Sequence, residues 1–251
     1  MVVLLTVVLC ATVAVAGFYA VQRFFPGLWN GSNNELVRIC SSLTGGLYGL
    51  LLAFVVVTAW QNYSNASTQV EDEISALSNV MRDAGGLPEE VRVPVRQDTL
   101  RYADLVVSRE WATLAQGDPD LASREMYEGV WERLYGFDPE TDAESTFFGS
   151  VVDRMNDVGR ARRLRIYSSR SAVPLLLWGL IVAGGVLTVF LLYLYRGGRV
   201  LTQAIMIGIV AGFIGFVVFL IYALDSPFGG ELKLSTQPFT YFIDQWRGKP
   251  L

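Results

Sequence analysis

Hydroxyl and amide side chains follow one face of a helix that is otherwise apolar, between Leu43 and Asn65. At helical spacing, this face carries Tyr48, Leu51, Phe54 or Val55, Thr58, and Gln61 or Asn62. Such a stripe can line an aqueous path for ions, or it can join neighbouring helices through hydrogen bonds. Both interpretations stay open, and we take this helix as the candidate pore helix.

Two acidic segments follow further along the chain. Glu71-Asp72-Glu73 could attract cations near a pore mouth, but solvated carboxylates at the start of a helix are the simpler explanation. Residues 138–144 have alternate carboxylates, as a calcium loop does. The glycine of such a loop is missing, and Gly149 stands where the bidentate glutamate should be, so we expect no metal there.

The composition indicates a membrane protein that also has a part in water. Of the 251 residues, 52% are hydrophobic and 18% are charged. The chain has no histidine, which excludes His/Cys zinc sites and Ser-His-Asp or Cys-His catalysis. A net charge of −4 argues against a nucleic-acid partner. We expect no enzyme activity and no cofactor, and we expect Cys10 and Cys40 to be free thiols.

Four apolar segments are long enough to span a membrane. They are residues 2–22, 43–65, 173–195 and 200–224, the last two joined by a tight turn at 196–199. The first has no basic segment before it and no cleavage pattern after it, so we expect a retained helix rather than a signal peptide. Small side chains predict close helix packing at Gly45, Gly49, Ala53, Gly208 and Gly212.

The segment between the second and third spans has a helical period throughout and no strand alternation. Helices are predicted at residues 68–84, 94–115, 121–135 and 145–170, with a short one at 240–246. The predicted fold is an all-α integral membrane protein with four transmembrane helices and a helical domain inserted between the second and third. Its parts are helices 1 and 2 (1–63), the helical domain (64–170), the hairpin of helices 3 and 4 (171–224) and the tail (225–251).

Arginines predict the orientation. Arg160, Arg162, Arg163, Arg165 and Arg170 precede the third span, and the tail on their side adds further cations. This bias predicts a multi-pass protein of the inner (cell) membrane, with both termini and the helical domain in the cytoplasm. The same arginines could hold anionic lipid head groups. No acidic or basic side chain lies within a predicted span, which argues against a proton-coupled transporter or a voltage sensor.

The segment after the last span carries the most specific motif. Residues 224–231 read LDSPFGGE, which resembles the Pro-Phe-Gly segment that follows the last membrane helix of bestrophins. The four spans and the helical insertion are similar too. The sequence LAFVVVTAWQ at 52–61, with Glu73, Leu77, Tyr102 and Glu110-Trp111, more closely resembles the bacterial bestrophin-like membrane proteins without assigned function.

Bestrophins are pentameric anion channels with a hydrophobic neck on the second membrane helix. The resemblance implies a neck at Leu51, Phe54, Val55 and Thr58. It also implies that the tail motif couples to the pore through Asp225, Pro227, Phe228 and Gly229, with Glu231 left from the acidic cluster of the calcium-regulated members. We predict a homo-oligomeric ion channel in lipid, a pentamer by resemblance, that conducts inorganic ions. The alternative is a non-conducting scaffold or accessory subunit whose cytoplasmic helices bind a protein partner.

Overall fold

The structure is a computed structural model that describes residues 1–25, 34–170, 173–195 and 199–248. All regular secondary structure in these residues is helical, which confirms the all-α fold. Residues 196–198 of the predicted turn between the last two spans lie outside the described residues. The chain divides into two compact units, one of Met1–Trp60 and Val173–Asp225 and one of Gln61–Ala172 and Ser226–Leu251.

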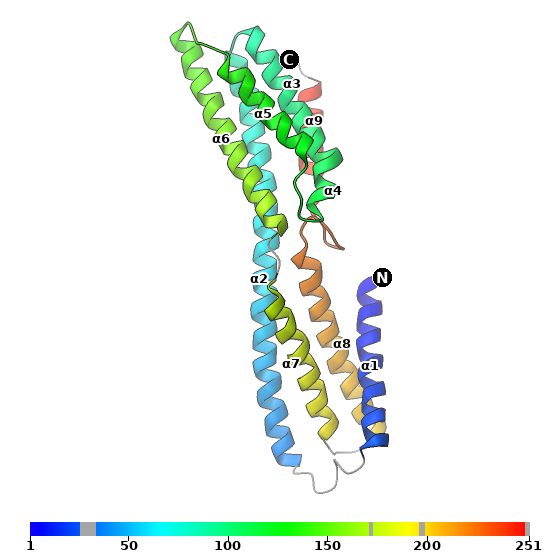
Figure 1. The fold of residues 1–251 in the computed structure, drawn as a ribbon. Helices are drawn as coiled ribbons and strands as arrows, with labels where there is room; N and C mark the ends of the chain where they lie inside the picture. Colours follow the sequence, from blue (N-terminus) through cyan, green and yellow to red (C-terminus); the bar gives the residue numbers. More distant parts are fainter. Residues whose placement is uncertain (26–33, 171–172, 196–198, 249–251) are drawn as a thin grey trace. The chain divides into compact units, whose positions relative to one another are not determined.

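The first unit holds the apolar helices: α1 (Val2–Phe24), the first part of α2 (Asn34–Asp83), α7 (Leu175–Leu194) and α8 (Val200–Asp225) (Figure 1). Each of the four belongs to a helical stretch that is long and apolar enough to cross a membrane. The described residues thus form an all-α membrane protein.

Within this unit, α1 packs along α8 through small side chains. A Cβ atom added at Gly212 would lie 3.3 Å from Val7 Cγ1, and one added at Gly208 would lie 3.3 Å from Val15 Cγ2. These distances leave no room for larger residues without movement. Such close approach is how helices associate in lipid, where no hydrophobic driving force brings them together.

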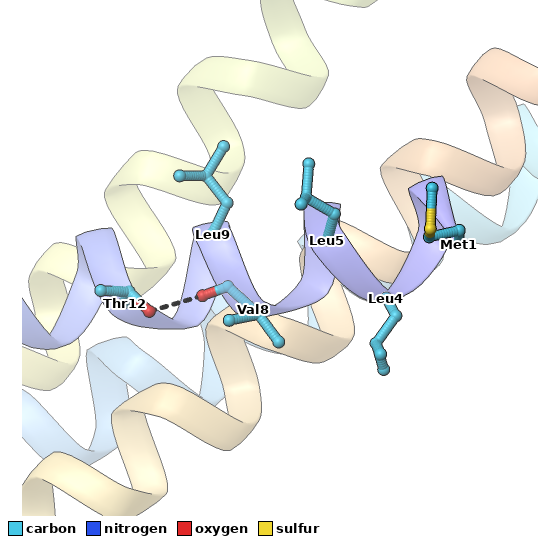
Figure 2. Close-up of a pocket in the computed structure, with 6 residues that line it drawn as sticks. All are labelled: Met1, Leu4, Leu5, Val8, Leu9 and Thr12. Carbon is cyan, nitrogen blue, oxygen red and sulfur yellow. Dashed lines mark hydrogen bonds between the residues drawn. The ribbon is translucent and has the colours of Figure 1, made fainter.

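The other side of α1 is uncovered. Leu4, Leu5, Val8 and Leu9 project from α1 over its first turns, as Figure 2 shows, and each is more than half exposed. The hydroxyl of Thr12 uses its donor within the helix, because it donates to the Val8 carbonyl at 2.7 Å. This surface suits lipid chains rather than water.

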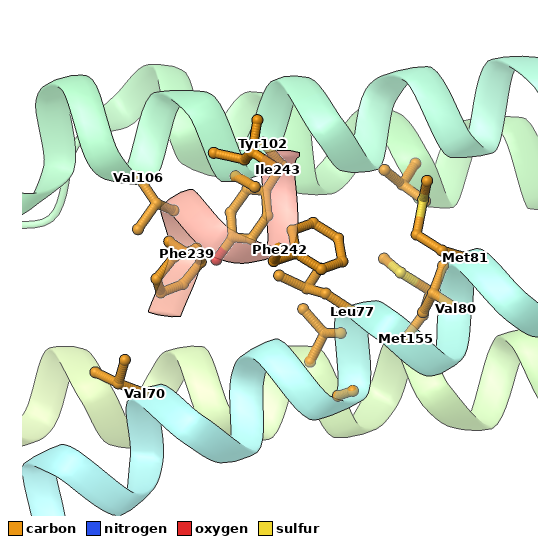
Figure 3. Packing of buried hydrophobic residues seen from close by; sticks show 14 of the residues in the cluster. Val70, Leu77, Val80, Met81, Tyr102, Val106, Met155, Phe239, Phe242 and Ile243 are labelled. Carbon is orange, nitrogen blue, oxygen red and sulfur yellow. The ribbon is translucent and has the colours of Figure 1, made fainter. Parts of the chain in front are cut away.

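The second unit contains the rest of α2 and the helices of the predicted insertion. The insertion helices are η2 (Ala84–Gly86), α3 (Glu89–Leu105), η3 (Val106–Glu110), α4 (Trp111–Leu114), α5 (Leu121–Tyr135) and α6 (Asp142–Arg170). The same unit also contains α9 (Gln237–Arg247), which comes from the predicted tail. In Figure 3, Leu77 of α2 and Met155 of α6 point toward Phe239 and Phe242 of α9. Both phenylalanines are fully buried, so the tail helix belongs to the core of this unit.

Two helices differ from the sequence prediction. The helices predicted at 43–65 and 68–84 are one continuous helix, α2, of 50 residues. The polar residues between them do not interrupt it. The Thr68 hydroxyl donates to the Ser64 carbonyl of the preceding turn and so does not compete for a backbone N–H group.

The helix predicted at 94–115 begins earlier, at Glu89. The carbonyl of Pro88 accepts its first hydrogen bonds, from the backbone N–H groups of Val91 and Arg92. Pro94 therefore lies inside α3 rather than in its first turn. The predicted helix also widens into a π-helical turn, η3, at Val106–Glu110 before α4. A π turn within a helix is rare and frequently marks a functional site.

Candidate functional site

One side of α2 in the first unit is buried against α7 and α8. Tyr48, Leu52 and Val55 lie in a hydrophobic cluster with Ile181 and Ile221. The Tyr48 hydroxyl donates to the Ile181 carbonyl at 2.9 Å, so this polar group is satisfied inside the bundle. This side of α2 holds the helix in its own chain.

Glycines of α7 receive the Tyr48 ring. A Cβ added at Gly184 would lie 2.5 Å from Tyr48 Cδ2, and one added at Gly185 would lie 3.0 Å from its hydroxyl oxygen. These glycines are not among the small residues predicted to pack closely. Their signal was present, because a large aromatic side chain in a bundle needs a small partner.

The opposite side of α2 is uncovered and apolar. Besides Val57, its exposed residues are Leu43, Leu47, Leu50 and Phe54, followed by Thr58. Their steps of four, three, four and four residues keep them on one face of a helix with 3.6 residues per turn. Phe54 is 67% exposed. Thr58 ends the stripe with a hydroxyl group that donates to the Phe54 carbonyl and keeps its acceptor capacity.

The predicted pore stripe therefore divides between two faces. Tyr48 and Val55 are buried against other helices of the chain, and Leu51 is half-buried. Phe54 and Thr58 lie on the exposed face, with Leu47 and Leu50, which the prediction did not include. In the second unit, Gln61 is exposed and Asn62 is half-buried.

A third side of α2 carries the small residues. Gly49 and Ala53 are exposed and Gly45 is half-buried. A Cβ atom added at Gly45 or Gly49 would meet no described atom within 4 Å, leaving aside the helix's own adjacent backbone. Gly208 and Gly212, by contrast, pack against α1. The small residues of α2 have no such partner helix within the described residues.

The tail motif is divided between the two units. In the first unit, the Asp225 carboxylate accepts a hydrogen bond from the backbone N–H of Val173. In the second unit, Phe228 is buried edge-on against Trp111, with ring centroids 5.2 Å apart. Gly229 lies beside Ala115, and Glu231 is exposed.

Backbone hydrogen bonds hold this part of the tail in place. The Leu234 N–H donates to the Pro227 carbonyl at 2.7 Å, and Trp111 Nε1 donates to the Leu234 carbonyl at 3.2 Å. Pro227 and Phe228 thus begin a tail that folds into the core of the second unit together with α9.

The second unit also buries a cluster of four charged side chains and one tyrosine, which the sequence patterns did not predict. Arg165 of α6 is fully buried and lies between two carboxylates. Its Nε is 2.6 Å from Glu73 Oε2, and its Nη2 is 2.9 Å from Glu110 Oε2. Arg162 Nη2 lies 3.0 Å from Glu110 Oε1, and the Tyr102 hydroxyl donates to Glu73. We call these five side chains the buried charge cluster.

The buried charge cluster has two positive and two negative groups, so its charges balance. Burial would lower the pKa of Arg165, but Glu73, Tyr102 and Glu110 raise it well above its ordinary value. Burial and the charge of Glu73 raise the pKa of the Tyr102 hydroxyl in turn. Arg165 stays charged and Tyr102 stays neutral at physiological pH.

These contacts revise two predictions. Of the acidic residues 71–73, Glu71 and Asp72 are exposed, but Glu73 is fully buried, so the segment is not simply a solvated helix start. Of the five arginines counted for orientation, Arg162 and Arg165 are neutralised in the buried charge cluster. Fewer free cations therefore remain beside the third span than the sequence count implies.

The acidic segment at 138–144 caps a helix. Glu144 Oε2 accepts from the backbone N–H groups of Glu140 and Thr141, and Thr141 Oγ1 accepts from the Glu144 N–H. This reciprocal arrangement is a capping box at the start of α6. Among the described residues, no cluster of three or more acidic, cysteine or histidine side chains could hold a metal ion.

The four apolar stretches define a helical membrane protein, and one of its spanning helices, α2, has one buried side and one uncovered side. The family model of the Bestrophin-like domain matches residues 8–239, so the chain belongs to the bestrophin-like family. No curated protein matches the chain.

Solved structures share the fold. Two variants of a bacterial bestrophin homologue from Klebsiella pneumoniae give TM-scores of 0.70 and 0.68, each at 14% identity. The alignments cover 98% of this chain and 98% and 99% of those chains. A structure described as a membrane protein gives a TM-score of 0.65 at 16% identity, over 97% of this chain and 95% of that one.

Proposed function

We propose that this chain is the subunit of an oligomeric bestrophin-like ion channel in which α2 lines the ion path. Family membership and the likeness to a bacterial bestrophin homologue support a channel. The observation that carries the proposal is the uncovered stripe of Leu43, Leu47, Leu50 and Phe54 on a spanning helix whose opposite side is buried.

Three sides of α2 then have three roles. Tyr48, Leu52 and Val55 bind α2 to its own chain. The small residues Gly49 and Ala53 let the next copy approach closely. The stripe remains for the centre of the ring, where copies of α2 meet around the symmetry axis. By family resemblance the ring has five copies.

The stripe forms the neck of this channel. Leucine and phenylalanine side chains give water no hydrogen-bond partner, so a narrow ring of them empties of water and blocks ions. Thr58 follows the ring with a hydroxyl oxygen and marks the place where the path becomes polar. The neck consists of Leu47, Leu50 and Phe54 rather than Tyr48 or Val55, because only exposed side chains can reach the axis.

Ion flux from liposomes tests the proposal. We expect the wild-type protein to release entrapped salt and Phe54→Ala to raise the rate, because a smaller side chain widens and wets the neck. Phe213→Ala is the matched control, since Phe213 of α8 is equally exposed, at 66%, but lies on another span. An inert wild type in several salts would favour the non-conducting scaffold. Equal effects of both substitutions would remove α2 from the ion path.

We also propose that the helical unit lies in the cytoplasm of a cell that carries the protein in its inner membrane. Arg163 and Arg170, together with Lys233 of the tail, support this orientation. A cysteine introduced at Asn34, at the start of α2, should react with a membrane-impermeant thiol reagent in intact cells. Labelling only after permeabilisation would mean that the protein has the opposite orientation.

A further inference from the structure

The first unit contains an apolar pocket of about 540 Å³ that the channel proposal does not use. Residues of α1, α2, α7 and α8 line it, among them Cys10, Tyr48, Val186 and Tyr193. All four helices belong to stretches that can cross a membrane. The pocket therefore lies at the depth of the lipid chains rather than in water.

The hydroxyl groups at this pocket are already hydrogen-bonded within the chain. Tyr48 donates to the Ile181 carbonyl at 2.9 Å and Tyr193 to the Ala14 carbonyl at 2.6 Å. Thr6 donates to the Val2 carbonyl at 3.0 Å. Buried water needs two to four polar partners, and the described lining offers few. A polar ligand would meet the same deficit.

The pocket is an open groove rather than an enclosed cavity, so its apolar lining faces whatever surrounds the bundle. Hydrocarbon is the apolar material that surrounds a membrane-spanning bundle. We propose that the pocket binds one acyl chain of a membrane lipid. The acyl chain lies in the groove formed by α1, α7 and α8, where α1 and α7 are joined by the Tyr193–Ala14 hydrogen bond.

Cys10 makes the pocket measurable, because its thiol is free and lines it. Cys40 is the internal control: it is also free and half-buried, but it is absent from the lining. The protein is stripped of lipid in a fluorinated surfactant, whose chains mix poorly with hydrocarbon, and alkylated with N-ethylmaleimide. Dioleoyl phosphatidylglycerol is then added and the alkylation repeated.

Added lipid should slow the alkylation of Cys10 by about tenfold, the ratio for a pocket filled about nine-tenths of the time, and leave Cys40 unchanged. Equally slowed alkylation of Cys10 and Cys40 would show that lipid coats the protein in general, which would contradict a specific site. A Cys10 thiol that is already protected in the stripped oligomer would show that a second copy covers the pocket, which also overturns it.

A pair of substitutions on α7 provides an independent test. Val186→Trp places a large side chain in the pocket, whereas Leu187→Trp places the same side chain on the same helix outside the lining. Native mass spectrometry should find one phospholipid per subunit retained by the wild type and by Leu187→Trp and lost from Val186→Trp. Equal retention by both variants would contradict the proposal.

Discussion

The two units of this protein bury their polar groups in different ways. In the first unit, tyrosine hydroxyls of the spans donate to backbone carbonyls, as Tyr48 does to Ile181, and the ring rests on glycine. In the second unit, Arg165 is buried between Glu73 and Glu110. Helices in lipid associate through close packing and hydrogen bonds between neutral groups. The core of a water-exposed unit can include charged side chains when each has a partner of opposite charge. The comparison predicts which single changes each unit tolerates.

The largest effect is expected from Arg165→Met in the second unit. This change leaves Glu73 and Glu110 buried without their shared cation, and removing one partner of a buried ion pair costs about 3–5 kcal/mol. The melting temperature of the purified protein should fall steeply. Arg160→Met is the control, because the Arg160 side chain is 69% exposed and its pair with Asp157 contributes less than about 1 kcal/mol. Equal losses would mean that the buried charge cluster does not stabilise its unit.

A smaller effect is expected from Tyr102→Phe, which removes a hydrogen bond to the charged Glu73. Such bonds contribute about 1.5–3 kcal/mol. Because burial and the charge of Glu73 raise the Tyr102 pKa well above 10.0, the unfolded chain loses this proton at lower pH than the folded chain. This stabilisation is therefore complete below about pH 10 and is lost as the pH rises further.

Thermal melts at rising pH check this prediction. The melting temperature of the wild type should fall more steeply above about pH 10 than that of Tyr102→Phe, because the variant has no hydroxyl to titrate at this site. Parallel curves would show that another tyrosine carries the dependence.

In the first unit, Gly184→Ala should destabilise by about 1–3 kcal/mol, because the new methyl group meets the Tyr48 ring and forces it to move. Gly179→Ala on the same helix is the control, since its Cβ meets no described atom. Alanine there should be neutral or stabilising by up to about 1 kcal/mol through helix propensity. Equal melting temperatures of the two variants would show that contact between the Tyr48 ring and Gly184 does not stabilise this unit.

Much of the fold follows from patterns in the sequence. Helices over 121–135 and from 145 to 170 agree with α5 and α6, because their inward residues repeat at regular helical steps. Helix boundaries without a glycine or proline were harder to predict. No such residue separates 43–65 from 68–84, and the two segments form one helix. The π turn at Val106–Glu110 was not predicted; it ends at Glu110, whose buried carboxylate pairs with Arg162 and Arg165.

The candidate site was predicted less completely. The apolar sequence predicted the spanning part of α2. It did not distinguish a buried Tyr48 from an exposed Phe54, because lipid, the surface of a neighbouring copy and a protein core are all apolar. The buried charge cluster had a usable signal. Val151, Met155 and Val158 continue in Arg162 and Arg165 at steps of four and three residues, which places both arginines on the inward face of α6.

The central claim is that the uncovered face of α2 lines an ion path. The most direct test is the flux through Phe54→Cys, in a chain whose native cysteines are replaced by alanine, before and after reaction with a charged methanethiosulfonate. We predict that modification changes the flux through Phe54→Cys and leaves Phe213→Cys unaffected, because a charge at the neck alters the wetting and the field that an ion meets. An unchanged flux through fully modified Phe54→Cys would contradict the account.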